Sequence, residues 1–241
     1  SRNNELTWIR DWVVFNQKYH GCDGILIHDN NSDAYGINDI HEYLKPIADD
    51  MQIVILSWPF KYGVADWRLP LSCGIADSLY CQAGMLEHAR RRFLVHSSSV
   101  LNTDIDELVI TEGGSSIFEL VENSTTGLLV LSGVWVENHP IRRRGASSRP
   151  RHRDFACVST GDQIGCETKW AVVPARAPNA AQWHVHRILG MSPSESRQLA
   201  ELRHFKAINT DWTVDRSRSR DRRTSTAAID PRIGYVEREA A

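Results

Sequence analysis

The chain has 241 residues, a formal net charge of −2 and a hydrophobic content of 41%. This length and composition fit a globular protein with a sizeable core in one large domain. The nearly neutral charge argues against a dedicated nucleic-acid binder, and no apolar run is long enough to cross a bilayer. The five cysteines are widely spaced and form no CxxC pair. We therefore expect free thiols in a reducing, cytoplasmic environment and no structural zinc site.

Helical and extended patterns alternate along the first half of the sequence. Apolar spacing predicts helices at about 6–17, 37–44, 75–92 and 115–121, and strands at 25–27, 53–56, 100–101, 127–136, 169–173 and 183–186. This order favours an α/β fold with a mostly parallel sheet. Ligands of such sheets bind at the carboxyl ends of strands, and Asp29 and Asp104 each follow a predicted strand. We expect the two carboxylates to face one crevice.

Two carboxylates two residues apart follow the apolar run at 100–101. Asp104 and Asp106 are separated by Ile105, and Glu107 comes next. In an extended segment, residues i and i+2 point the same way, so the two aspartates can face one ion or one phosphate. Carboxylate oxygens suit Mg²⁺ or Mn²⁺, which share substrate phosphates. The other interpretation of these residues is a solvated turn after a buried strand.

Arginine is concentrated in two stretches. The residues are Arg142, Arg143, Arg144, Arg149, Arg151 and Arg153 in the first, and Arg216, Arg218, Arg220, Arg222 and Arg223 in the second. Such runs are usually solvated loops or tails, and the functional interpretation is contact with anionic lipid or phosphate, at the inner face of a membrane. We predict one domain over 1–214, followed by an Arg-rich polar tail over 215–241.

Several short motifs share a recognisable order. They are Asn4-Glu5, Asp29-Asn30-Asn31-Ser32, Trp58-Pro59-Phe60, Gln82, Asp104-Ile105-Asp106-Glu107, Lys169-Trp170, His184-Val185-His186 and Arg203-His204-Phe205-Lys206. Over residues 2–210 this series resembles the GT-A-fold glycosyltransferases of the family-2-like and family-92-like group. The resemblance implies a mixed sheet flanked by helices. In that group a first strand precedes the Asn-Glu pair, and here only Ser1 and Arg2 precede it, so the expected fold lacks that strand or has it truncated.

The resemblance also implies a set of donor and metal ligands. Residues expected at the nucleotide-sugar donor are Asn4, Glu5, Asp29, Asn30, Gln82 and Asp104. Those expected around Mn²⁺ or Mg²⁺ are Asp104, Asp106 and one of His184 and His186, with His186 favoured. In such enzymes the cation offsets charge that builds on the departing nucleoside diphosphate.

An inverting enzyme also needs a general base that removes the proton of the attacking hydroxyl. Glu137, at the end of the strand predicted at 127–136, and Glu107 are the two candidates, and a supporting or surface role is open for both. His20, His139 and His152 have no motif around them, so we expect them at the surface or in loops.

The resemblance makes the leading hypothesis a metal-dependent glycosyltransferase. It moves a sugar from a nucleotide-sugar to a hydroxyl acceptor, such as a cell-envelope glycan. Two other hypotheses use the same residues. One is a non-catalytic nucleotide- or glycan-binding module on the same fold, and the other is a metal-dependent phosphoesterase.

Overall fold

The computed structural model describes residues 1–48, 50–62, 80–141, 149–159, 165–194, 199–210 and 227–229. The α-helices in these ranges are α1 (Leu6–His20), α2 (Ile37–Ala48), α3 (Tyr80–Arg92) and α4 (Ile117–Glu122). The strands are β1 (Gly24–Asp29), β2 (Gln52–Ser57), β3 (Val100–Asn102), β4 (Glu107–Thr111), β5 (Leu128–Val136), β6 (Cys157–Ser159), β7 (Cys166–Val172), β8 (Gln182–Trp183), β9 (Ile188–Leu189), β10 (Ala200–Phe205) and β11 (Ala227–Ile229). None of the described helices is long and apolar enough to span a membrane.

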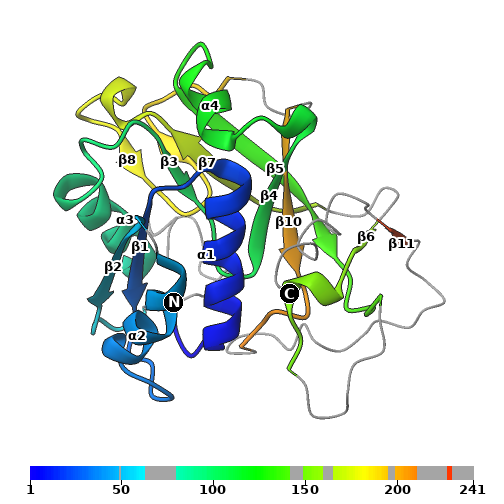
Figure 1. The fold of residues 1–241 in the computed structure, drawn as a ribbon. Helices are drawn as coiled ribbons and strands as arrows, with labels where there is room; N and C mark the ends of the chain where they lie inside the picture. Colours follow the sequence, from blue (N-terminus) through cyan, green and yellow to red (C-terminus); the bar gives the residue numbers. More distant parts are fainter. Residues whose placement is uncertain are drawn as a thin grey trace, which may run out of the picture.

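The described strands form a parallel pair, a larger mixed sheet and a short antiparallel pair of β8 and β9 (Figure 1). Strands β1 and β2 run parallel and level, with Asp29 opposite Ser57. The larger sheet runs β11-β6-β5-β10-β4, and β7 joins it beside β5 with β3 as the next strand. The chain is therefore mixed α/β with helices flanking the sheets, as predicted. The expectation of a mostly parallel sheet is wrong for the larger sheet, where only β5 and β10 pair in parallel among the described ladders.

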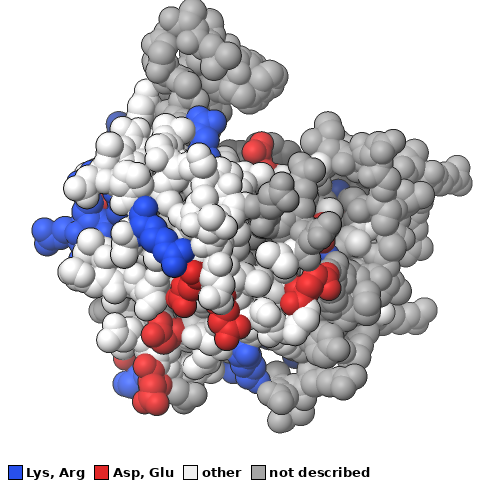
Figure 2. Space-filling view, turned by 90° about the horizontal axis from the view of Figure 1, so that it is seen from above, with Lys and Arg blue, Asp and Glu red and all other residues white. Residues whose placement is uncertain are grey.

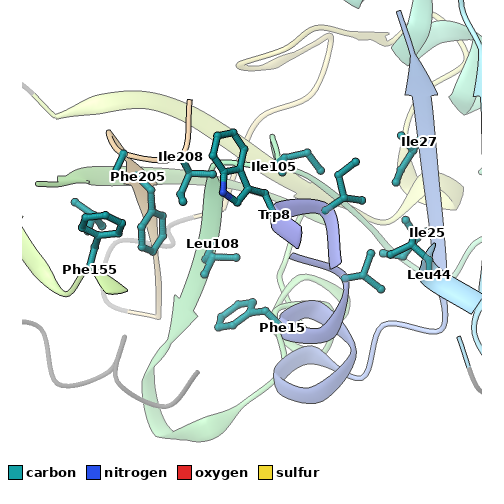
Figure 3. Packing of buried hydrophobic residues seen from close by; sticks show 14 of the residues in the cluster. Trp8, Phe15, Ile25, Ile27, Leu44, Ile105, Leu108, Phe155, Phe205 and Ile208 are labelled. Carbon is teal, nitrogen blue, oxygen red and sulfur yellow. The ribbon is translucent and has the colours of Figure 1, made fainter. Parts of the chain in front are cut away.

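Helix α1 packs between the two sheets (Figures 1 and 3). On the side of the parallel pair it meets Ile25 and Ile27, and on the other side it meets Leu108 and Phe205. The Trp8 ring contributes to this core, and its indole N–H donates to the carbonyl of Pro150 at 2.7 Å. The apolar face of α1 thus packs against both β1 and the larger sheet and fixes their relative position.

Helix α4 covers the opposite face of the larger sheet. Ser116 and Glu119 form a reciprocal capping box at its N-terminus, which satisfies backbone donors that the helix leaves unpaired. The helix buries Ile117 and Val121 against Leu129 and Leu202 of the sheet. The larger sheet is therefore packed on both faces.

Most predicted elements exist, with altered ends. Helix α2 continues past Pro46 to Ala48. The predicted helix at 75–92 is α3, and its first five positions lie outside the described residues. The predicted strand at 183–186 is reduced to β8, because a turn begins directly after Trp183. Strand β11 comes from within the predicted tail and pairs antiparallel with β6.

Gly133 lies at the closest approach of β5, β10 and β7. A Cβ atom at this position would lie 2.6 Å from Leu202 Cβ and 2.7 Å from Cys166 Sγ. We expect Gly133→Ala to destabilise the fold by about 1–3 kcal/mol through overpacking. Gly84→Ala is the control, because its Cβ would meet only Trp58 at an ordinary 3.7 Å and alanine favours helix α3. Urea unfolding tests this pair, and a stable Gly133→Ala protein contradicts the described packing.

Candidate functional site

The carboxyl ends of β1 and β2 are tied together by polar side chains. Asp29 accepts hydrogen bonds from the Ser32 hydroxyl at 2.5 Å and from the Ser32 N–H at 3.1 Å. The Asn30 amide donates to the carbonyls of Trp58 and Phe60 at 2.7 and 2.8 Å. The strand ends are thus rigid, and both side chains predicted to bind the donor already take part in holding this turn.

Residues 1–5 lie along the same edge. The Ser1 nitrogen donates to the carbonyl of His28 and the Asn30 N–H donates to the carbonyl of Ser1, so Ser1 pairs with the end of β1. The carboxylates of Asp29 and Asp104 both lie within electrostatic range of Ser1. Asp29 and Asp104 therefore lie in the same region of the molecule, and a shared crevice stays a prediction.

The other predicted donor residues surround this edge less directly. Asn4 donates from its amide to the Ser1 hydroxyl at 3.1 Å, and its carbonyl accepts from the Tyr35 hydroxyl at 2.7 Å. Glu5 directly precedes α1 without a side-chain capping hydrogen bond, and its Oε1 lies 3.5 Å from Arg149 Nε. Gln82 lies half-buried in the first turn of α3. Asn4 and Glu5 therefore shape the loop beside Asp29.

The Asp-x-Asp stretch closes into a tight turn between β3 and β4. The N–H of Asp104 donates to the Glu107 carboxylate at 2.8 Å, which fixes the turn from inside. Lys169 of β7 contacts the turn from the buried side. Its Nζ lies 2.5 Å from Asp104 Oδ2 and 3.4 Å from Glu107 Oε2. The side chains of Lys169 and Glu107 are each only 1% exposed, whereas that of Asp104 is 49% exposed. Asp104 is thus the outward-facing carboxylate of a buried ion-pair network.

His204 of β10 completes the network on its other side. Its Nε2 lies 3.0 Å from Asp106 Oδ2, and its Nδ1 lies 3.4 Å from Glu107 Oε1. The imidazole stacks on Trp135 at a ring separation of 4.2 Å. Each oxygen of Glu107 therefore faces one basic side chain, Lys169 on one side and His204 on the other.

Opposing electrostatic effects set the protonation states of this network. Burial raises the pKa of Glu107 to about 7, although Lys169 acts against that change. Burial disfavours charge on Lys169 and on His204, but the carboxylates outweigh it: the pKa of Lys169 rises, and that of His204 rises to about 10. Desolvation also opposes the Asp104 charge, and Lys169 overcomes it and lowers the pKa of Asp104 to about 2. Lys169 and His204 are therefore cations at neutral pH.

The arrangement does not fit the predicted metal site. Within the described ranges, no three His, Cys, Asp or Glu side chains form a group that could hold a metal ion. Asp104 bonds Lys169 and Asp106 bonds His204. A metal-ligating histidine usually uses its other ring nitrogen for a hydrogen bond. His186 has such a partner, since its Nδ1 lies 2.9 Å from the carbonyl of Thr168. The loop that carries His184 and His186 is held near β3, because the Asn102 amide donates to the carbonyl of Val185 at 2.9 Å.

Both predicted proton acceptors are buried in ion pairs. Glu107 lies inside the turn, as described above. Glu137 accepts from Lys206 Nζ at 2.6 Å, and this ammonium lies 5.7 Å from the Trp135 ring centroid. Glu107 and Glu137 therefore each have basic partners within the fold, and their role as proton acceptors stays a prediction.

Part of the first arginine stretch is anchored in the fold. Arg151 forms a bidentate ion pair with Asp11 of α1, and His152 is fully buried with its Nε2 2.8 Å from the carbonyl of Ile105. His20 is also buried, 3.0 Å from the carbonyl of Val109. The expectation of surface positions is wrong for both histidines, because His20 contacts a carbonyl of β4 and His152 contacts a carbonyl of the turn between β3 and β4. Residues 142–144 and 216–223 lie outside the described ranges. On the face in Figure 2, described basic and acidic side chains lie interspersed.

The Asp11–Arg151 pair makes stability depend on pH. Burial acts to raise the pKa of Asp11, but Arg151 outweighs it and the net pKa is lowered. The pair therefore stabilises the fold above the unfolded pKa, and this contribution is lost as pH falls through the lower folded value. We expect Asp11→Asn to cost about 1.5–3 kcal/mol at neutral pH and progressively less from about pH 5 to pH 2. Urea unfolding across that range tests this, and Arg151→Met should show the same trend. A pH-independent difference contradicts the assignment.

The two basic members of the central network, Lys169 and His204, stand in motifs of the resemblance, but the sequence assigned them no role in the site. Lys169 stands inside an apolar strand, at a position that alternation assigns to the interior. A lysine at such a position needs a buried anionic partner, and that was the available signal. His204 had no such signal, because its partner Asp106 is 98 residues away in the chain.

No protein-family model matches the chain, and no curated protein matches it significantly.

Proposed function

We propose that this protein is a nucleotide-sugar-dependent glycosyltransferase with a GT-A-like fold. The observation that carries the proposal is that Asp29, at the carboxyl end of β1, and Asp104, shortly after the end of β3, both lie close to Ser1 at one edge. In open α/β sheets this edge is where nucleotides bind. The ordered motifs that resemble the family-2-like and family-92-like group support the same assignment.

At this edge, carboxylate oxygens that the fold holds in place recognise the nucleotide-sugar by accepting its hydrogen bonds. The Asp104 oxygen that does not contact Lys169 accepts hydrogen bonds from hydroxyls of the nucleotide-sugar. Lys169 keeps this carboxylate ionised and oriented. Charge-assisted hydrogen bonds of this kind are about twice as strong as neutral ones. The acceptor oxygen then bonds to the anomeric carbon of the sugar with inversion, the nucleoside diphosphate leaves with the electron pair of the broken bond, and the hydroxyl proton passes to solvent. We assign no step to a metal ion, because the predicted ligands do not come together as a group of three among the residues that the structure describes.

Release of nucleoside diphosphate from UDP- and GDP-sugars, with and without a glycan acceptor, tests the proposal. Turnover in the wild type that falls in Asp29→Asn and Asp104→Asn supports it. No turnover of any donor contradicts it, and release of inorganic phosphate indicates the phosphoesterase instead.

A non-catalytic nucleotide-binding module is the second candidate. The observation that favours it is the burial of Glu107 and Glu137 in ion pairs, which removes both predicted proton acceptors from the surface. Such a module binds nucleoside diphosphate but turns over no donor, so the same experiment distinguishes the two.

A further inference from the structure

Lys169 is a fully buried ammonium directly behind a half-exposed carboxylate. Its side chain is 1% exposed, and its Nζ lies 2.5 Å from Asp104 Oδ2. Trp170 and Ala171, the next residues of β7, are also fully buried, so Lys169 projects from the interior of the sheet. A lysine is rarely buried in this way unless anionic partners compensate its charge.

The partners of Lys169 are the acids that a divalent cation would need. Asp104 gives it one oxygen and Glu107 gives it another at 3.4 Å. Asp106 bonds His204 at 3.0 Å, so the second aspartate also has a cationic partner. Two protein cations therefore already compensate most of the negative charge of the three carboxylates in this cluster.

A divalent ion at Asp104 would meet two obstacles. It would compete with Lys169 for the Asp104 carboxylate, and the buried ammonium would then lose its closest partner. It would also lie near a fixed positive charge where surrounding protein screens poorly, so that the two cations repel strongly. The obstacles share one cause, because a buried lysine has no solvent-exposed position to which its charge can move.

We infer that Lys169 is a positioning residue that takes the place of a divalent cation at the Asp104–Asp106 turn. It holds Asp104 Oδ2 inward, leaves the other oxygen facing solvent, and keeps Mn²⁺ and Mg²⁺ off the pair. The inference deepens the proposed function, since it makes donor binding at this edge independent of metal. The metal-binding test below stands apart from any test of donor turnover.

Mn²⁺ titration followed by electron paramagnetic resonance tests the inference. The proteins are the wild type, Lys169→Met, Lys169→Arg and Asp104→Asn. We expect the wild type, Lys169→Arg and Asp104→Asn to take up Mn²⁺ equally weakly. Lys169→Met, which keeps the side-chain length and removes the charge, should bind one equivalent more than about tenfold tighter. Adding Asp104→Asn to Lys169→Met should abolish that gain.

Two results overturn the inference. One is a wild-type protein that binds one Mn²⁺ tightly and loses it in Asp104→Asn. The other is a folded Lys169→Met protein with no gain in Mn²⁺ affinity. If Lys169→Met does not fold, the comparison of wild type with Asp104→Asn decides by itself. UDP and GDP titrations in EDTA are read separately, so a failure of the proposed function is distinguished from a failure of this inference.

Discussion

Replacing Asp104 with asparagine is expected to weaken nucleoside-diphosphate binding by about 10- to 100-fold. The substitution keeps the size of the side chain and removes its charge, and a hydrogen bond to a charged group contributes about 1.5–3 kcal/mol. The Asp104 carboxylate is the half-exposed member of its network, so its outer oxygen can meet a ligand. Isothermal titration calorimetry with UDP and GDP measures the change.

The matched control for this substitution is Asp23→Asn. Asp23 is an exposed aspartate that precedes β1, at the end of the strand opposite to Asp29. We expect this variant to bind as the wild type does. Equal weakening in both variants contradicts a specific role for Asp104, and so does unchanged binding in Asp104→Asn.

Truncating Trp8 to alanine is expected to destabilise the fold by about 3–5 kcal/mol. The Trp8 ring is buried between the two sheets, and its N–H bond to Pro150 is lost with it. Because α1 holds the sheets together, the loss should also weaken nucleotide binding by disordering the edge that contains Asp29 and Asp104. Urea unfolding measures the stability change.

Tyr19→Ala is the control on the same helix. Tyr19 is an exposed aromatic residue that packs on Phe15, and its truncation is expected to cost less than about 1 kcal/mol. Equal losses in the two variants contradict the central position of Trp8 in the core.

The fold was largely predictable from local patterns. Apolar spacing located α1, and the runs at 25–27 and 53–56 gave the parallel pair. Strand pairing was less accessible, because β3 and β7 join across about 70 residues through contacts that no local pattern contains. The end of α2 was misplaced because Pro46 lies within the helix, where proline is normally disfavoured.

The candidate site was predictable in its acids and not in its bases. Asp29 and Asp104 follow strands, so their shared edge was a consequence of topology. The acids were assigned to a metal because two carboxylates two residues apart suit Mg²⁺ or Mn²⁺, and because the resemblance implies a metal there. Lys169 and His204 come from β7 and β10, and only the folded sheet brings them to Asp104 and Asp106.

The most direct test of the central claim is calorimetric titration of the wild-type protein with UDP and GDP in EDTA. The titration is repeated with Asp29→Asn and Asp104→Asn. We predict that the wild type binds one equivalent of at least one of these nucleotides without added metal, and that each substitution weakens this binding. A wild-type protein that binds neither nucleotide, with or without Mn²⁺, would contradict the claim that this edge is a nucleotide-sugar site.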